Sequence, residues 1–343
     1  MNKAPSMKEW QRLYDVALEF KKLDCWNWMY DDTLFGVQNP EDGEIGYCCI
    51  MGNLGAMFAI AVHLGTDGLE GYFRIQSGET EGTDPMLASQ KCLMASFENR
   101  NYLQKEDLQI VKKLGLKLRG RNEWPVFRSY MPGYFPWFLT KNEALFLTTA
   151  IEQAMDVVLR FREDDGLLTS PGGDECLVRV PDKTEDIVLW KDRWMSPAPA
   201  KKTIIIDDRV DETRIQRIKK KAVSVDAVWE IDIAFAPTPI REKKERPFFP
   251  RMFAVMDHHS GFDLDAYLFG ISDGTSVFRD HFLSLLEKMG LLLQEILIKN
   301  DETLQLLEPI TSRLNIKVSQ VLKLLAFEEF HDGMFGFFRT NKG

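Results

Sequence analysis

Apolar residues in the first part of the chain recur with two different periods. Helical spacing follows each of two capping motifs, one opening at Ser6 and the other at Thr140. Between these helices lie short strand-like runs, and the turn-forming segment 39–43 joins the first two of them into a hairpin. The runs are residues 34–38, 44–51 and 57–64. The pattern predicts an α+β N-terminal domain with a mainly antiparallel sheet.

A proline-rich segment, 237–250, is the best candidate for a domain boundary. Its four prolines remove backbone donors and disfavour helix, and its mixed charges favour contact with water. The alternating strand-like run 227–235 precedes this segment and is therefore assigned to the first domain. With 343 residues, the chain exceeds one average domain. We expect two domains, 1–240 and 248–343.

Beyond this segment, strand-like and helical patterns alternate. The uninterrupted apolar run 252–256 is typical of a strand covered on both faces, and a turn at Ser260 leads into a partner strand. The later elements are a helix at 276–289, a strand at 295–299, a helical stretch from Asp301, a strand at 316–321 and a helix at 322–330. A β-hairpin followed by alternating helices and strands predicts an α/β C-terminal domain with a partly parallel sheet.

The charge balance argues against nucleic acid as a partner. The chain carries 43 Lys and Arg residues against 52 Asp and Glu, which gives a formal net charge of −9. A nucleic-acid footprint needs clustered cations that displace counterions from the phosphates. Hydrophobic residues at 45% and charged residues at 28% are ordinary for a soluble globular protein. We expect a small-molecule or protein partner instead.

Several features point to a cytoplasmic protein that does not enter the membrane. The N-terminus lacks the apolar stretch of a signal peptide, and the most apolar run, 52–65, is shorter than the roughly 20 residues of a membrane span. The five cysteines form no CxxC pair, which favours reduced thiols. Cys48 and Cys49 are neighbours on a predicted strand, so their side chains should point to opposite faces.

The N-terminal part resembles a bacterial family known only as a domain of unknown function. The segment from about Phe249 resembles a second such family, which is often its neighbour. The motifs that carry the first resemblance are Trp26-Asn27-Trp28, Leu34-Phe35-Gly36-Val37, Gly43-Glu44-Ile45-Gly46-Tyr47-Cys48-Cys49 and Met51-Gly52. Together the two resemblances imply an uncharacterised bacterial two-domain protein, and neither implies an activity.

The order of elements in the C-terminal domain also resembles a reduced ribonuclease H or integrase core. In that superfamily, one carboxylate in the first strand and another after the fourth strand bind divalent metal. The matching positions here are Asp257 and Asp301. The resemblance implies a third carboxylate on a late helix, at Glu328, Glu329 or Asp332. The segment 268–276 is too short for the third strand that such a core requires, so the core is expected to be incomplete.

A stretch rich in aromatic residues and proline, 119–137, is the candidate ligand site. Large rings and arginines together suit a planar or anionic ligand, through stacking and bidentate contacts. The residues expected to line this cleft are Arg121, Trp124, Arg128, Tyr134 and Trp137. The alternative is a long connection that its own aromatic side chains attach to the core.

Two functions follow from these candidates. The first is a non-catalytic protein that binds a ligand or partner through the N-terminal cleft. The alternative is a divalent-metal-dependent phosphoester hydrolase, with Asp257, Asp301 and Glu328 as catalytic residues and the first two as metal ligands. Around Asp257, the sequence favours a polar hairpin end with solvated charges over a metal site. The sequence identifies no cofactor, and no phosphate-binding loop, nucleophile elbow or HExxH motif occurs. We therefore favour the binding protein.

Overall fold

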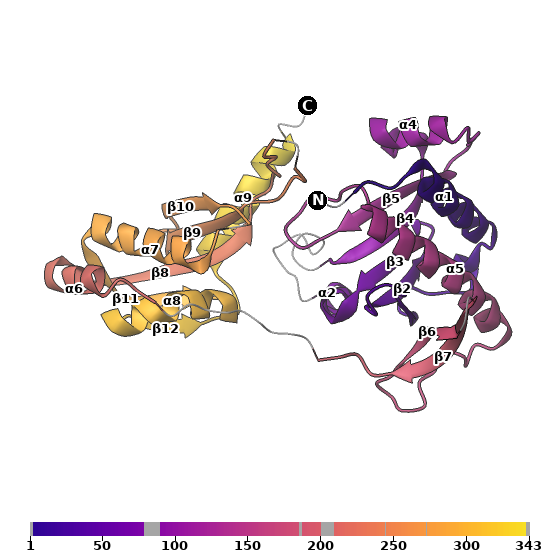
Figure 1. The fold of residues 1–343 in the computed structure, drawn as a ribbon. Helices are drawn as coiled ribbons and strands as arrows, with labels where there is room; N and C mark the ends of the chain where they lie inside the picture. Colours follow the sequence, from indigo (N-terminus) through magenta and orange to yellow (C-terminus); the bar gives the residue numbers. More distant parts are fainter. Residues whose placement is uncertain are drawn as a thin grey trace. The chain divides into compact units, whose positions relative to one another are not determined.

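The computed structural model describes residues 3–78, 90–184, 187–199, 209–243, 245–271 and 273–340. The chain forms two compact units (Figure 1). Among the described residues, the first unit holds 3–78, 90–132 and 136–199, and the second holds 133–135 together with those from 209 onward. None of the helices in the described ranges has the length and apolar content of a membrane span.

The first unit is built on a seven-stranded sheet with the order β5-β4-β3-β2-β1-β6-β7. Neighbouring strands are antiparallel except for β1 and β6, which are parallel. The predicted α+β domain with a mainly antiparallel sheet is therefore confirmed. The strands are β1 (Leu34–Gln38), β2 (Ile45–Met51), β3 (Phe58–Leu64), β4 (Cys92–Glu98), β5 (Trp124–Tyr130), β6 (Cys176–Thr184) and β7 (Ile187–Met195).

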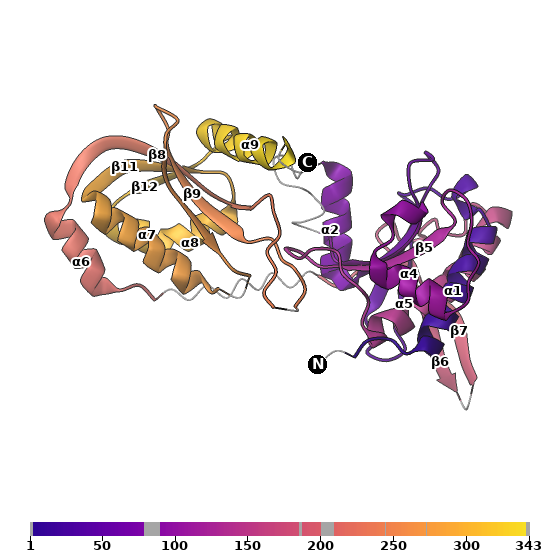
Figure 2. The same cartoon turned by 90° about the horizontal axis from the view of Figure 1, so that it is seen from above.

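Helices cover both faces of this sheet (Figure 2). On one face, α1 (Met7–Lys22) and α5 (Lys141–Glu163) enclose the main core, and each begins with the predicted capping box. On the other face, α2 (Gly65–Ser77) packs against a smaller cluster that includes Tyr47. Because side chains alternate along β2, Cys48 points to the first core and Cys49 to the second, as predicted. The short helix α4 (Lys105–Lys113) precedes the edge strand β5.

The second unit contains a mixed five-stranded sheet with the order β10-β9-β8-β11-β12. Strands β8, β9 and β10 form an antiparallel meander, and β11 and β12 run parallel to β8. The strands are β8 (Val223–Phe235), β9 (Arg251–Asp257), β10 (Asp263–Phe269), β11 (Leu291–Ile298) and β12 (Lys317–Gln320). This arrangement confirms the predicted α/β domain with a partly parallel sheet.

The helices of the second unit lie on opposite faces of its sheet. The larger core lies between the sheet and three helices, and a smaller cluster lies beneath a single helix at the end of the chain. Strand β9 contributes Phe253 and Val255 to the first core and Ala254 and Met256 to the second, as expected for a strand covered on both faces. The helices are α6 (Glu212–Lys221), α7 (Thr275–Met289) and α8 (Asp301–Leu314) on one face, and α9 (Leu325–Thr340) on the other.

The division between the units differs from the predicted boundary at 237–250. Strand β8, which we assigned to the first domain, is the central strand of the second sheet and pairs with both β9 and β11. Segment 237–250 is the connection from β8 to β9, and Ile240 pairs with Phe248 across it. Prolines and mixed charges are as suitable for a long connection within one unit as for a linker between domains.

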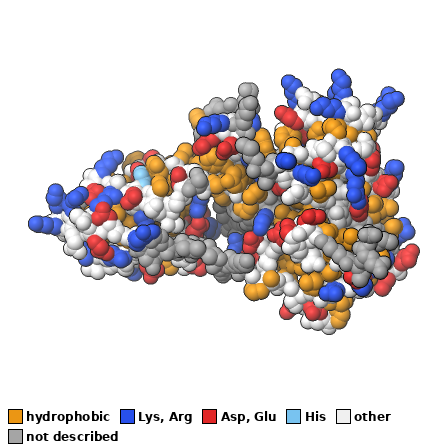
Figure 3. All heavy atoms as spheres, in the orientation of Figure 1, with side chains coloured by type: hydrophobic (Ala, Val, Ile, Leu, Met, Phe, Trp, Pro, Cys, Tyr) orange, Lys and Arg blue, Asp and Glu red, His pale blue; other side chains and the backbone are white. Residues whose placement is uncertain are grey.

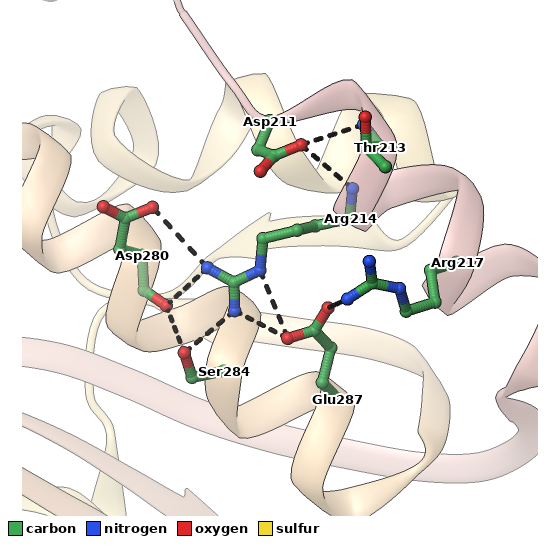
Figure 4. A network of polar contacts seen from close by, with 7 residues as sticks. All are labelled: Asp211, Thr213, Arg214, Arg217, Asp280, Ser284 and Glu287. Carbon is green, nitrogen blue, oxygen red and sulfur yellow. Dashed lines mark hydrogen bonds and ion pairs between the residues drawn. The ribbon is translucent and has the colours of Figure 1, made fainter.

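A polar network holds α6 against α7 (Figure 4). The Arg214 guanidinium donates to Glu287 at 2.7 and 3.2 Å and to the Ser284 hydroxyl at 2.8 Å. This contact holds the pKa of the Glu287 carboxyl below its ordinary range. Arg217 reaches the same carboxylate at 3.5 Å, but its side chain is 55% exposed, against 17% for Arg214. The network therefore depends mainly on Arg214.

Replacing Arg214 should release α6 from α7. We expect Arg214→Ala to lower the free energy of opening of α6 by about 1–2 kcal/mol, because three charge-assisted contacts are lost at once. Arg217→Ala is the matched control, and its effect should stay below about 0.5 kcal/mol. Native-state hydrogen exchange of the α6 amides measures both. Equal exchange in the two variants would show that apolar packing alone holds the helix.

Candidate functional site

The structure gives Arg128, the central residue of the predicted cleft, a structural role. Its side chain is 8% exposed on β5, and its two terminal nitrogens donate to the Asp107 carboxylate of α4 at 2.9 and 2.5 Å. One of them also donates to the Phe127 carbonyl at 2.7 Å. The guanidinium lies 4.7 Å from the Phe138 ring centroid. Arg128 thus connects α4 to the sheet through a buried bidentate ion pair.

The other four residues of the predicted cleft belong to different parts of the fold. Arg121 is exposed in the turn before β5, and Trp124 begins that strand. Trp137 pairs its backbone with β5. Tyr134 belongs to the second unit, where its ring packs against Phe248. The arrangement matches the alternative interpretation of this stretch, in which aromatic side chains attach a long connection to the core. The ligand-binding role of these five residues stays a prediction.

A pocket of about 760 Å³ lies elsewhere in the first unit, beside α2 and the loop that follows α5. Strands β1, β2 and β6 contribute to it, together with the middle of α2 and the last turn of α5. Its apolar lining includes Leu34, Leu69, Phe73 and Phe161. Phe73 is 55% exposed, which is unusual for a large apolar side chain and marks the open side of the pocket. The volume is in the range of small-molecule sites.

Local hydrogen bonds fix the two loops that border the pocket. The loop before β1 is held by its Asp31 carbonyl, which accepts from the Tyr72 hydroxyl at 2.6 Å and from the Cys49 thiol at 3.2 Å. In the loop after α5, the Ser170 hydroxyl accepts from the backbone N–H of Glu175 at 3.3 Å. Gly173 in the same loop has a φ of +87°, which favours glycine. Both loops therefore have defined conformations at the rim.

The charges around the pocket have one sign. Four carboxylates line it, and none of the described residues that line it is Lys or Arg. Burial raises the pKa of the Cys176 thiol to about 12, so this cysteine stays a protonated, unreactive thiol. The arrangement offers acceptors for a cation and apolar surface for an organic body. The four carboxylates are Asp32, Asp165, Asp174 and Glu175.

The three carboxylates predicted to be catalytic do not form a common site. Asp257 accepts from the Ser260 backbone and hydroxyl at 2.8 and 2.7 Å, which lowers its pKa and caps the hairpin turn. Asp301 accepts from Gln320 at 3.3 Å, and Glu328 pairs with Lys299 at 3.1 Å. Each of these side chains therefore has a local partner. The two other candidates for the third position, Glu329 and Asp332, are exposed on α9.

Sheet topology explains why Asp257 and Asp301 are separated. Our prediction assumed that the strands preceding these two residues end at the same edge of a parallel sheet. Instead, β9 is antiparallel to β8 whereas β11 is parallel to it, so β9 and β11 end at opposite edges. The strand directions therefore do not bring Asp257 and Asp301 together in the way that we expected, and their role as metal ligands stays a prediction. Among the residues that the structure describes, no three His, Cys, Asp or Glu side chains are arranged to hold a metal ion.

Two buried carboxylates on β8 escaped the sequence reasoning. Asp232 accepts from the Asn300 amide at 2.8 Å and the Thr303 hydroxyl at 2.9 Å, and burial raises its pKa. Glu230 contacts His258 Nδ1 at 2.7 Å and accepts from the Phe327 backbone at 3.0 Å. The alternation along β8 placed both carboxylates on one face, which suggested a solvent-facing side. Helix α9 covers that face.

On the face shown in Figure 3, Lys and Arg side chains are interspersed with Asp and Glu over both units. The sequence as a whole carries 43 Lys and Arg residues against 52 Asp and Glu.

Comparison with known families agrees with the two-unit architecture. A model of a domain of unknown function (DUF7309) matches residues 10–179, and a model of a second domain of unknown function (DUF6930) matches residues 214–335. The first match falls largely in the first compact unit and the second in the second. A search of the curated proteins gives no match. The chain is therefore a tandem of two domains of unknown function, a DUF7309 domain followed by a DUF6930 domain.

Proposed function

We propose that the protein is a non-catalytic binding protein, and that its first unit binds a small organic cation in the pocket beside α2. The observation that carries this proposal is the combination of a 760 Å³ pocket with four carboxylates at its lining. Electrostatic complementarity favours a cation at such a site and disfavours an anion. The partner class is thus a small molecule with a positive charge.

The apolar lining supports an organic cation over a simple ion. Phe73 and Phe161 are aromatic, and aromatic faces attract cations that have lost part of their hydration. Leu34 and Leu69 offer aliphatic surface that a hydrocarbon body can cover. An inorganic cation would use only the oxygen atoms of the lining. An amine with an apolar body uses both halves of the pocket.

The state of the cysteines supports the expected cytoplasmic location. All five are free, and four of them are buried. Reduced thiols are typical of proteins in a reducing compartment.

For the second unit we infer a ribonuclease H-like topology. A three-stranded antiparallel meander followed by two parallel strands supports this inference, because β8 supplies the strand that the sequence interpretation lacked. In such a core the carboxylate of the first strand would be Asp232 rather than Asp257. That carboxylate is already occupied by Asn300 and Thr303. A metal-dependent phosphoester hydrolase would require this carboxylate to be released from Asn300 and Thr303. We therefore favour ligand binding over phosphoester hydrolysis as the function.

Charge removal at the pocket tests the proposal. We expect phenethylamine to bind the wild-type protein and 3-phenylpropanoate, which has a similar size and opposite charge, not to bind. Asp174→Asn combined with Glu175→Gln should weaken phenethylamine binding about five- to tenfold, because two carboxylates near the cation are neutralised. Isothermal titration calorimetry at low salt measures the dissociation constants.

Glu19→Gln is the matched control, because Glu19 is exposed on α1 and does not line the pocket. It removes one negative charge from the same unit and should leave phenethylamine binding unchanged. Binding of 3-phenylpropanoate with equal affinity, or unchanged amine binding in the double variant, would contradict the proposal.

A further inference from the structure

Tyr47 differs from the other residues that line the pocket. It lies in the middle of β2, lines the pocket, and is only 3% exposed. Its hydroxyl has no hydrogen-bond partner among the residues that the structure describes. By contrast, the hydroxyl of Tyr72, which belongs to the same cluster, donates to the Asp31 carbonyl at 2.6 Å. Two neighbouring tyrosines thus have different roles.

The Tyr47 side chain is buried as a whole, but its hydroxyl oxygen is accessible from the pocket that the residue lines. A tyrosine hydroxyl in this position can form a hydrogen bond with water or with a molecule that enters the pocket. Burial also raises the pKa of Tyr47, so the phenol stays protonated and keeps a proton to donate. Among the residues that the structure describes, none accepts a hydrogen bond from this hydroxyl. A ligand can supply the acceptor.

The positions of the polar groups define the two ends of such a ligand. Asp32, Asp165 and Asp174 are exposed on the loops at the rim, whereas Tyr47 is buried on a strand of the sheet. Apolar side chains, among them Leu69 of α2, lie in the same lining. A ligand that reaches from rim to floor therefore meets carboxylates, then apolar surface, then one hydroxyl.

We propose that Tyr47 is the specificity-determining residue of this pocket. Its hydroxyl forms a hydrogen bond with a polar group at the buried end of an amphipathic amine. The ligand class is an organic amine whose cation faces the rim and whose opposite end carries a hydroxyl or carbonyl. This inference rests on the proposed function, because it assigns the second end of the same ligand. Tyr47 contributes one neutral hydrogen bond, and the carboxylates contribute the attraction for the cation.

A matched pair of amines tests the inference. Tyramine carries a phenolic hydroxyl at the end opposite its amine, and phenethylamine is the same molecule without it. We expect the wild-type protein to bind tyramine about fivefold more tightly than phenethylamine, as one net hydrogen bond predicts. Tyr47→Phe should bind both amines with the affinity that the wild-type protein shows for phenethylamine. Glu175→Gln should weaken both amines by the same factor.

The outcomes separate this inference from the proposed function. Equal affinity of the wild-type protein for the two amines would overturn the role of Tyr47 while leaving the cation site in place. A preference for tyramine that persists in Tyr47→Phe would overturn it as well. Failure of both amines to bind would overturn the proposed function itself. Because the comparison of the two amines uses the wild-type protein, it holds even if Tyr47→Phe folds poorly.

Discussion

Arg128→Ala is expected to lower the free energy of unfolding of the first unit by about 3–5 kcal/mol, which makes it one of the most disruptive single changes in that unit. Arg128 and Asp107 are 8% and 4% exposed and are joined by two hydrogen bonds. Removal of the guanidinium leaves the Asp107 carboxylate buried without its cation. Urea denaturation followed by circular dichroism measures the change.

Two further variants establish that the loss comes from an unpaired charge. Asp107→Asn should destabilise the unit by a similar amount, because it leaves Arg128 buried without its anion. Arg128→Met combined with Asp107→Leu removes both charges and keeps apolar volume, so it should recover most of the stability. Phenethylamine binding should be unchanged in the fully folded double variant, because neither residue lines the pocket. A double variant as unstable as Arg128→Ala would contradict this explanation.

Local signals predicted the first unit well. The capping boxes at Ser6 and Thr140 begin α1 and α5, and the turn at 39–43 joins β1 to β2. These features depend on residues within a few positions of one another, so the local sequence is enough to predict them. Arg128 shows the limit of such reasoning. Its partner Asp107 lies on another element, and sequence spacing gave no sign of the ion pair.

The second unit shows how one tertiary contact changes an interpretation. The alternation along β8 correctly predicted a strand, and it placed Glu230 and Asp232 on one face. Alternation identifies the two faces of a strand but does not tell which element covers each. The same pattern also leaves open which sheet the strand joins. The predicted boundary at 237–250 followed from our assignment of β8 to the first domain. The choice of Asp257 as the carboxylate of the first strand followed from the same assignment.

The pocket could not be predicted from the sequence. Its lining combines residues from β1, β2, β6, α2 and α5 with two loops, and Asp32 and Glu175 are separated by more than half of the first unit's sequence. Each of these residues has an ordinary explanation where it stands in the chain. Exposed Asp residues suit loops, and Leu69 suits the buried face of a helix. Only the fold brings the carboxylates and Tyr47 into the lining of one pocket.

Asp232→Ala is expected to lower the free energy of unfolding of the second unit by about 3–5 kcal/mol. One carboxylate oxygen of Asp232 accepts from Asn300, from Thr303 and from the Ile233 backbone, at 2.8–2.9 Å. Alanine leaves these donors without their acceptor at a site that is 8% exposed. Asn300 and Thr303 begin α8, so the loss also loosens the start of that helix.

Asp232→Asn separates the hydrogen bonds from the charge. An asparagine oxygen can accept from the same three donors, and it removes the carboxylate whose pKa burial raises. Because the pKa of Asp232 is higher in the folded state than in the unfolded state, its protonated form stabilises the wild-type protein below about pH 4. This stabilisation is lost as the pH rises through the folded-state pKa. The asparagine variant lacks this loss, so its stability relative to wild type should rise across the same window and be highest at neutral pH. Urea denaturation at a series of pH values from 4 to 8 measures the difference in stability between the variant and the wild-type protein, in which the other titrating groups cancel.

An asparagine variant as unstable as Asp232→Ala at neutral pH would show that the fold requires the negative charge itself. Such a result would favour a cation bound at Asp232, and it would make phosphoester hydrolysis the favoured function.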